Sequence, residues 1–120
     1  MDKTFLLLGS LAAFLAVALG AFGAHGLRGR LAPDMLAVFQ TGVQYPMYHA
    51  LALILVAGIM GHLSGWLIQT AGWCFVAGIV LFSGSLYLLA VTGVTTLGAI
   101  TPIGGLLFLA GWACLAFAAI

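Results

Sequence analysis

The sequence predicts an all-α integral membrane protein: an antiparallel bundle of four transmembrane helices, with an interfacial amphipathic helix between helices one and two. Three observations predict this class. The 120-residue chain has only five charged side chains, and none follows Asp34. It is 65% hydrophobic, with a mean hydropathy of +1.31. Uncharged apolar stretches of about twenty residues recur, and that length crosses the hydrocarbon core of a bilayer.

The composition also excludes several kinds of protein. A water-soluble domain needs roughly a quarter to a third of its surface residues charged, whereas only 4% of this chain is charged. A net charge of +1 leaves no basic footprint for nucleic acid. The spans of a β-barrel alternate in polarity over about ten residues, and the apolar runs of this sequence do not alternate. We therefore expect a single transmembrane domain over residues 1–120.

The first span is predicted over residues 5–24, where the chain is almost entirely apolar or small. Lys3 before it and the small residues near Ala24 are also typical of a signal peptide. The run is long enough to cross a bilayer, so we interpret it as a retained transmembrane helix. A polar loop at residues 25–33 follows and contains two arginines.

The segment at residues 34–45 is predicted to form the interfacial amphipathic helix. Pro33 suits a first helical turn, and Asp34 beside it complements the helix dipole. Apolar and polar residues separate at helical spacing: Met35, Phe39 and Val43 fall on one side, and Asp34, Ala37, Thr41 and Gln44 on the other. Such a helix lies in the plane of the interface. The alternative is one long tilted helix that continues into the second span.

Three further spans are predicted at residues 43–60, 66–91 and 97–120, which contain no charged residue. Short turns join them, and short connections make sequence neighbours antiparallel. Small residues recur every four positions on the first span and every seven on the last: Ala12, Ala16, Gly20 and Ala24, then Gly104, Gly111 and Ala118. Such stripes let helix backbones approach closely. We expect them to pack inside the bundle, with self-association as the alternative.

Polar residues concentrate in the half of the predicted bilayer that lies opposite the termini. This half holds His25, Gln40, Gln44, Tyr45, Tyr48, His49, Ser83, Ser85, Tyr87 and Thr101. Lipid offers these side chains no hydrogen-bond partners. We therefore predict a connected network there, in which His49 bonds to another helix around Ser83 to Tyr87. The tryptophans of the other half are interpreted as interfacial anchors or packing residues: Trp66, Trp73 and Trp112.

Two prolines each have a glycine four residues earlier: Gly42 with Pro46, and Gly98 with Pro102. Proline removes the hydrogen bond to the carbonyl four residues before it and crowds that group. Glycine at that position gives the backbone room to yield, so we predict a kink at each pair. A shaped entry into the helix is the simpler interpretation. A ligand-coordinating break of the kind found in transporters is the alternative.

Four of these segments together resemble a known family. They are GAFGAHGL (20–27), QTGVQYPMYHALAL (40–53), FSGSLYLLAVTG (82–93) and GAITPIGGLLFLAGW (98–112). In this order they are similar to the YgdD/YwdK-like family of small bacterial inner-membrane proteins, a domain of unknown function. The resemblance implies four spans in the bacterial inner (cytoplasmic) membrane, and it supplies no reaction, ligand or catalytic residue. Relatives usually carry another residue at position 46, and they often end in a basic tail.

Four spans would place both termini on one side of the membrane. Lys3 lies on that side and Arg28 and Arg30 on the other, so the positive-inside rule alone favours a cytoplasmic 25–33 loop. The basic tails of the resembling proteins favour cytoplasmic termini instead. We follow the family and expect the termini in the cytoplasm.

The sequence supports three hypotheses about function. The favoured one is a structural or accessory protein that packs with membrane lipid, with itself as a homo-oligomer, or with a larger membrane complex. The first alternative is a channel or transporter component for ions or small solutes that acts as an oligomer. The second is a haem protein with His25 and His49 as axial ligands.

No catalytic, cofactor or metal site is predicted. An enzyme is not expected, because no carboxylate lies inside a predicted span to act as a general base. The spacing of Cys74 and Cys114 matches no metal or redox motif. We interpret these two cysteines as small buried hydrophobic side chains.

Overall fold

The computed structural model describes residues 2–63 and 65–120, and this part of the chain forms four long helices. They are α1 (Asp2–His25), α2 (Pro33–Ile59), α3 (Trp66–Thr92) and α4 (Thr101–Ala118), with a 3-10 helix η1 (Thr95–Ala99) before α4. Each is long and apolar enough to cross a membrane when η1 is taken together with α4. The prediction of an all-helical protein with four candidate spans is confirmed.

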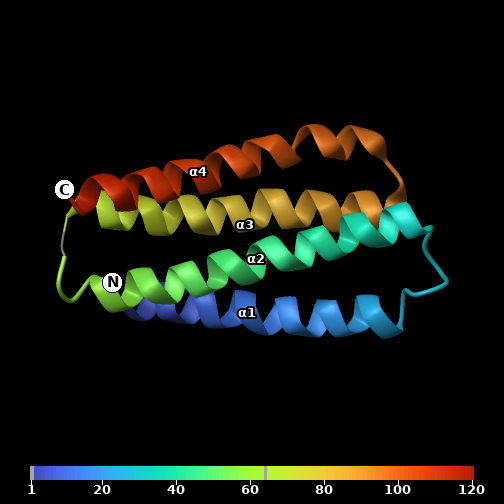
Figure 1. Cartoon of the computed structure of the whole chain (residues 1–120), viewed down its shortest axis with the longest axis horizontal. Coiled ribbons are helices and arrows are strands. Elements are labelled where there is room, and N and C mark those ends of the chain that lie inside the picture. Colours follow the sequence, from blue (N-terminus) through green and yellow to red (C-terminus); the bar gives the residue numbers. More distant parts are fainter. Residues whose placement is uncertain (1, 64) are drawn as a thin grey trace.

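The helices lie in chain order, and each packs mainly against its neighbours in sequence. Consecutive helices run antiparallel, and α1 begins at the end of the molecule where α4 finishes (Figure 1). Only 17% of the residues in the spanning windows of the outer helices α1 and α4 are buried, against 44% in α2 and 39% in α3. The molecule measures 47 × 26 × 18 Å. Helices that are not neighbours in sequence also touch, because Phe5 of α1 packs on Gly72 of α3 and His49 of α2 stacks on Phe108 of α4.

α2 differs from its prediction. The predicted interfacial helix at residues 34–45 and span at residues 43–60 form one continuous helix, which is the alternative left open above. The predicted separation of sides is present, since Phe39 is buried and the polar side is exposed. The apolar side packs against other helices, because Phe39 contacts the Gly23 backbone of α1 and the Tyr87 ring of α3. These contacts hold the segment in the bundle, so no separate helix forms.

Phenylalanine rings fill the space that glycines leave on the facing helix. A Cβ atom added at Gly104 would lie 2.6 Å from the backbone nitrogen of Phe82, and one at Gly111 would lie 2.5 Å from the Phe75 ring. The predicted small stripe of the last span therefore packs inside the protein, against α3. The largest fully buried side chains complete this core: Phe5, Leu53, Val56, Ile68 and Phe75.

The small stripe of α1 packs inside the protein over most of its length. Ala16 is 2% exposed, and a Cβ atom at Gly20 would lie 3.2 Å from Val43 of α2. Ala24, at the end of the stripe, is exposed. The close contacts of α1 are therefore used mainly on α2, as expected for packing within one chain.

The two proline–glycine pairs have different roles. Pro46 lies inside α2, and Gly42 one turn earlier is where α3 comes close, since a Cβ there would lie 2.9 Å from the Tyr87 ring. Pro102 lies in the first turn of α4, and Gly98 lies in η1. A helix boundary thus stands where the second kink was predicted, because a proline in the first turn gives up no intrahelical bond. The bend at Pro46 stays a prediction.

Short connections join the helices. Residues 26–32 link α1 to α2, and residues 60–65 link α2 to α3. α3 ends at Thr92, and the residue after it, Gly93, has a left-handed φ of 72° that suits glycine. η1 then turns the chain, so the fourth helix begins at Thr101 rather than at the predicted residue 97.

Candidate functional site

The His49 side chain connects α2 to α4. Its Nε2 accepts a hydrogen bond from Trp112 Nε1 at 3.1 Å, and its Nδ1 lies 2.8 Å from the carbonyl oxygen of Tyr45. An indole N–H can only donate and a carbonyl can only accept, so the imidazole carries its single proton on Nδ1 and is neutral. The ring also stacks on Phe108, with the centroids 3.6 Å apart. Both ring nitrogens are therefore engaged.

The prediction that His49 bonds to another helix is confirmed, but the predicted partner, around Ser83 to Tyr87, was wrong. Because α2 begins at Pro33, His49 lies sixteen residues from the start of α2 and ten from its end. This position is at mid-depth and places His49 beside Trp112 instead. The sequence did contain a signal for this pairing. Trp112 lies six residues before the end of α4, and a tryptophan at that depth still needs an acceptor for its N–H.

A second polar contact connects α3 to the start of α4. The Ser85 hydroxyl donates to the Phe82 carbonyl at 2.9 Å and lies 2.6 Å from the Thr101 hydroxyl. A hydroxyl has one proton, so Thr101 is the donor in the second bond. This bond fixes the first turn of α4 against α3.

The remaining predicted network residues of α2 lie apart from these two contacts. They face outward: Gln40, Gln44, Tyr45 and Tyr48 are exposed, the two tyrosines by 40% and 54%. His25 is also exposed, at the last position of α1. The structure therefore divides the predicted single network into a His49–Trp112 pair, a Ser85–Thr101 pair and an exposed polar side of α2.

The two histidines of the haem hypothesis lie far apart along the bundle axis. α1 and α2 are antiparallel, and Gly23 packs on Phe39, so His25 is level with residue 37 of α2. Twelve residues separate that level from His49, which is about 18 Å at the helical rise. Since His49 also uses both nitrogens, the geometry does not fit two axial ligands to one haem.

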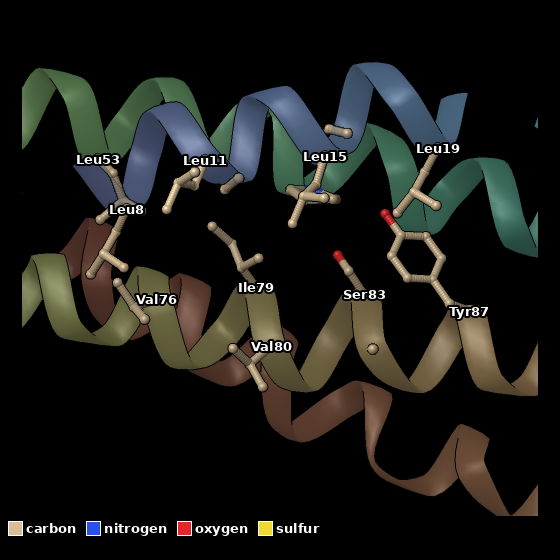
Figure 2. Close-up of a pocket in the computed structure, with 14 residues that line it drawn as sticks. Leu8, Leu11, Leu15, Leu19, Leu53, Val76, Ile79, Val80, Ser83 and Tyr87 are labelled. Atoms are coloured by element: carbon tan, nitrogen blue, oxygen red, sulfur yellow. The ribbon is translucent and has the colours of Figure 1, made fainter. Parts of the chain in front are cut away.

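An apolar groove of about 320 Å³ lies between α1 and α3, with α2 as its floor (Figure 2). Its walls are formed mainly by aliphatic side chains: Leu8, Leu11, Leu15 and Leu19 of α1, and Val76, Ile79 and Val80 of α3. Pro46 and Leu53 of α2 contribute to the floor. No charged residue is among its lining residues, all of which the structure describes.

Two hydroxyls of α3 belong to this groove. Ser83 is 3% exposed, and its Oγ has no hydrogen-bond partner among the residues that the structure describes. Tyr87 follows one turn later and also lines the groove. Figure 2 shows both hydroxyls directed from α3 toward α1, between Leu15 and Leu19. Both residues were predicted in the polar network and the groove was not predicted, although their spacing of four puts them on one helix face.

Comparison with known proteins identifies relatives along almost the whole chain. Residues 19–105 match the family model described as "Protein of unknown function (DUF423)". The UPF0382 membrane protein YwdK of Bacillus subtilis is 56% identical over 119 residues, which cover 98% of this chain and 97% of that protein. UPF0382 membrane proteins of Staphylococcus haemolyticus and Staphylococcus aureus are 50% and 47% identical, over 92% and 97% of this chain and 89% and 94% of theirs. No solved structure matches the chain.

Proposed function

This chain belongs to the DUF423 (UPF0382) family of membrane proteins of unknown function, and from that premise we propose that it is a non-enzymatic accessory protein of the bacterial cytoplasmic membrane. In this role it docks on another membrane protein through the exposed polar side of α2. We define this polar side as Gln40, Gln44 and Tyr48, which are spaced by four and therefore lie on one helix face.

The depth of the polar side carries this proposal. α2 has 27 residues and is about 40 Å long, about 10 Å longer than the hydrocarbon core of a bilayer. Gln44 lies eleven residues, about 16 Å, from the start of α2. Even if the first turns of α2 lie in the interface, the Gln44 amide is at hydrocarbon depth. An unpaired amide there is costly, and a polar group on the helix of another protein would satisfy it.

The interior of the protein supports an accessory role more than transport. The space between α3 and α4 is filled by phenylalanine rings set against glycines, such as Phe108 at Gly78 and Phe75 at Gly111. The His49 imidazole stacks into the same core. A solute path would have to run outside this core, between copies of the chain. Asp34 is exposed in the first turn of α2, and no aspartate or glutamate follows it in the sequence.

Copurification under mild conditions tests whether the polar side of α2 binds another membrane protein. The tagged chain is cross-linked in its native membrane and extracted, and its partners are identified by mass spectrometry. Gln44→Leu should lose the main cross-linked partner, because a leucine side chain is stable in lipid and offers no hydrogen bond to a partner. Gln69→Leu is the matched control, since Gln69 is exposed near the start of α3, and it should keep the partner.

Two outcomes would contradict the proposal. The first is an identical set of partners for Gln44→Leu and the wild-type chain. The second is a particle that contains only copies of this chain and dissociates on Gln44→Leu. That result would assign the polar side to self-association and would favour an oligomeric channel.

A further inference from the structure

We propose that the groove between α1 and α3 binds a neutral, membrane-soluble carbonyl compound of the quinone type, whose oxygen accepts hydrogen bonds from Ser83 and Tyr87. This site is separate from the polar side of α2 and does not depend on the partner proposed above. Its assignment rests on the shape of the groove, the state of Ser83 and the depth of the two hydroxyls.

The shape of the groove suits a small apolar molecule that enters from the lipid. From Leu8 to Leu19 it follows eleven residues of α1, about 16 Å. Its volume of about 320 Å³ lies at the lower end of the range for small-molecule sites, about 300–1,000 Å³. Leu11 and Val80 at its edges are 51% and 64% exposed, so it opens laterally toward the surrounding lipid. A longer tail would remain in that lipid.

Ser83 is the residue whose side chain needs a polar atom of the ligand as its hydrogen-bond partner. It is nearly fully buried, its Oγ lacks a partner among the described residues, and its hydroxyl points into the groove (Figure 2). Its neighbour Ser85 is equally buried but fully engaged with Phe82 and Thr101. A buried hydroxyl without a partner is unfavourable, and a ligand oxygen in the groove would remove this cost.

The depth of Ser83 selects the class of ligand. Ser83 lies nine residues, about 14 Å, before the end of α3. α3 exceeds the hydrocarbon core by about 5 Å at each end, so the Ser83 hydroxyl lies about 9 Å inside the hydrocarbon. The ester groups of a phospholipid stay at the boundary with the headgroups, too shallow to meet it. A quinone, in contrast, is uncharged and carries its carbonyl oxygens on an apolar body that can enter the hydrocarbon.

The two hydroxyls favour an acceptor oxygen. A carbonyl has two lone pairs and no proton, so it can take a hydrogen bond from Ser83 and another from Tyr87. The groove has no charged lining residue to neutralise a carboxylate or an amine, and burying such an unpaired charge is strongly unfavourable. The ligand is therefore neutral, and its recognition is by apolar contact with one acceptor oxygen.

Decylubiquinone serves as the probe, in equilibrium dialysis against the purified chain in detergent micelles, with empty micelles as the reference. The wild-type chain should retain one decylubiquinone per chain above the micelle background. Ser83→Ala should weaken retention about tenfold, the effect of one lost buried hydrogen bond, and Tyr87→Phe should weaken it similarly. Ala12→Leu fills a lining position and should abolish retention, whereas Ala18→Leu, exposed on the same helix, should not.

Ser85→Ala is the matched control for Ser83→Ala. It removes the bond to Thr101 and should lower the thermal stability of the ligand-free chain while leaving retention unchanged. Ser83→Ala removes no hydrogen bond to the part of the chain that the structure describes and should leave that stability unchanged. Gln44→Leu should retain decylubiquinone fully, so failure of the docking proposal and failure of the groove proposal are distinguishable.

Three results would overturn the proposal. One is retention by Ser83→Ala equal to that of the wild-type chain, which would mean that the serine donates within its own helix. Another is a phospholipid, detected by native mass spectrometry, that Ala12→Leu displaces and Ser83→Ala does not. The third is loss of a cross-linked protein partner in Ala12→Leu, which would show that a helix of that partner occupies the groove.

Discussion

His49 shows how the partners of one residue decide its chemistry. A histidine inside a bilayer is unfavourable unless both nitrogens find partners. Trp112 donates to one nitrogen and the Tyr45 carbonyl accepts from the other, so the neutral ring is satisfied on both sides. If Nε2 of His49 also carried a proton, its N–H would point at the indole N–H of Trp112, and neither group could accept a hydrogen bond. The arrangement therefore favours a structural role over proton transfer or metal ligation.

The His49–Trp112 bond should be measurable in a double-mutant cycle with His49→Phe and Trp112→Phe. Trp112→Phe alone leaves His49 Nε2 buried without a donor and should cost about 1–3 kcal/mol of unfolding free energy. The coupling energy between the two sites should lie between about 0.6 and 1.7 kcal/mol, which are the average and the largest values measured for hydrogen bonds between membrane helices.

Unfolding in mixed micelles of denaturing and mild detergent provides the free energies for this cycle. Gln69→Leu is the control, because Gln69 is exposed near the start of α3 and should leave the free energy unchanged. A coupling energy near zero would refute the bridge. The same result would return Trp112 to the role of a simple anchor.

At the scale of the element, the contact between α3 and α4 depends on alternation of glycine and phenylalanine. Gly104 faces Phe82, Gly111 faces Phe75, and Gly78 of α3 faces Phe108 of α4. Without a hydrophobic driving force between helices in lipid, such close approach provides the packing energy. The first turn of α4 is held in addition by the bond between Ser85 and Thr101.

Gly104→Leu and Gly105→Leu form a matched pair that tests this contact. A Cβ at Gly104 would lie 2.6 Å from the Phe82 backbone nitrogen, whereas a Cβ at Gly105 meets nothing within 4 Å. Gly104→Leu should therefore destabilise the protein by about 1–3 kcal/mol or more, the cost of overpacking a filled core. Gly105→Leu should be neutral or slightly stabilising, because leucine favours the helix over glycine.

Thermal unfolding in detergent, followed by circular dichroism, compares the two variants. Size-exclusion chromatography is run alongside, since a self-association contact at Gly104 would change particle size instead of stability. Equal melting temperatures for the two variants would be inconsistent with the packing that the structure shows.

At the scale of the whole molecule, the four helices form a staggered row in chain order with α1 and α4 at its edges (Figure 1), and α2 reaches α4 through His49 and Phe108. This arrangement leaves two exposed features on different sides of α2. One is the polar side that includes Gln44, and the other is the groove whose floor includes Pro46. Burial in the two inner helices holds the row together, and the outer helices face lipid over most of their surface.

The orientation of this row in the membrane is testable by labelling single cysteines. Cys74 and Cys114 are free and are first replaced by alanine. Cysteines placed at Arg28 and Thr95 should react from one side of the membrane, and cysteines at His62 and Ile120 from the other, because consecutive spans alternate in direction. We expect the second pair to be cytoplasmic.

A membrane-impermeant maleimide applied to intact cells and to inverted vesicles separates the two sides. If any of the four positions falls in the wrong group, the four-span arrangement is incorrect. If the pairs group as expected but Arg28 and Thr95 are cytoplasmic, only the orientation is reversed. The positive-inside rule applied to Arg28 and Arg30 would then have been the better guide.

Much of the architecture was predictable because it depends on local composition. The uncharged run after Asp34 and the short connections determine four long apolar helices, since length and hydropathy suffice to define a span. The small stripe of the last span could also be assigned to a helix contact. The interfacial segment was mistaken for a separate helix, because its amphipathic pattern is the same whether its apolar side faces lipid or α1.

Composition and hydropathy along the chain predict the class, the number of candidate spans and the need of buried polar groups for partners. Which partners these groups find depends on how the helices pack. His49 pairs with Trp112, 63 positions away, while Ser83 faces a groove and has no partner among the described residues. A span is a property of consecutive residues, whereas the rotation and depth of each helix follow from packing between distant segments. Glycine and phenylalanine set that packing at contacts such as Gly104 with Phe82.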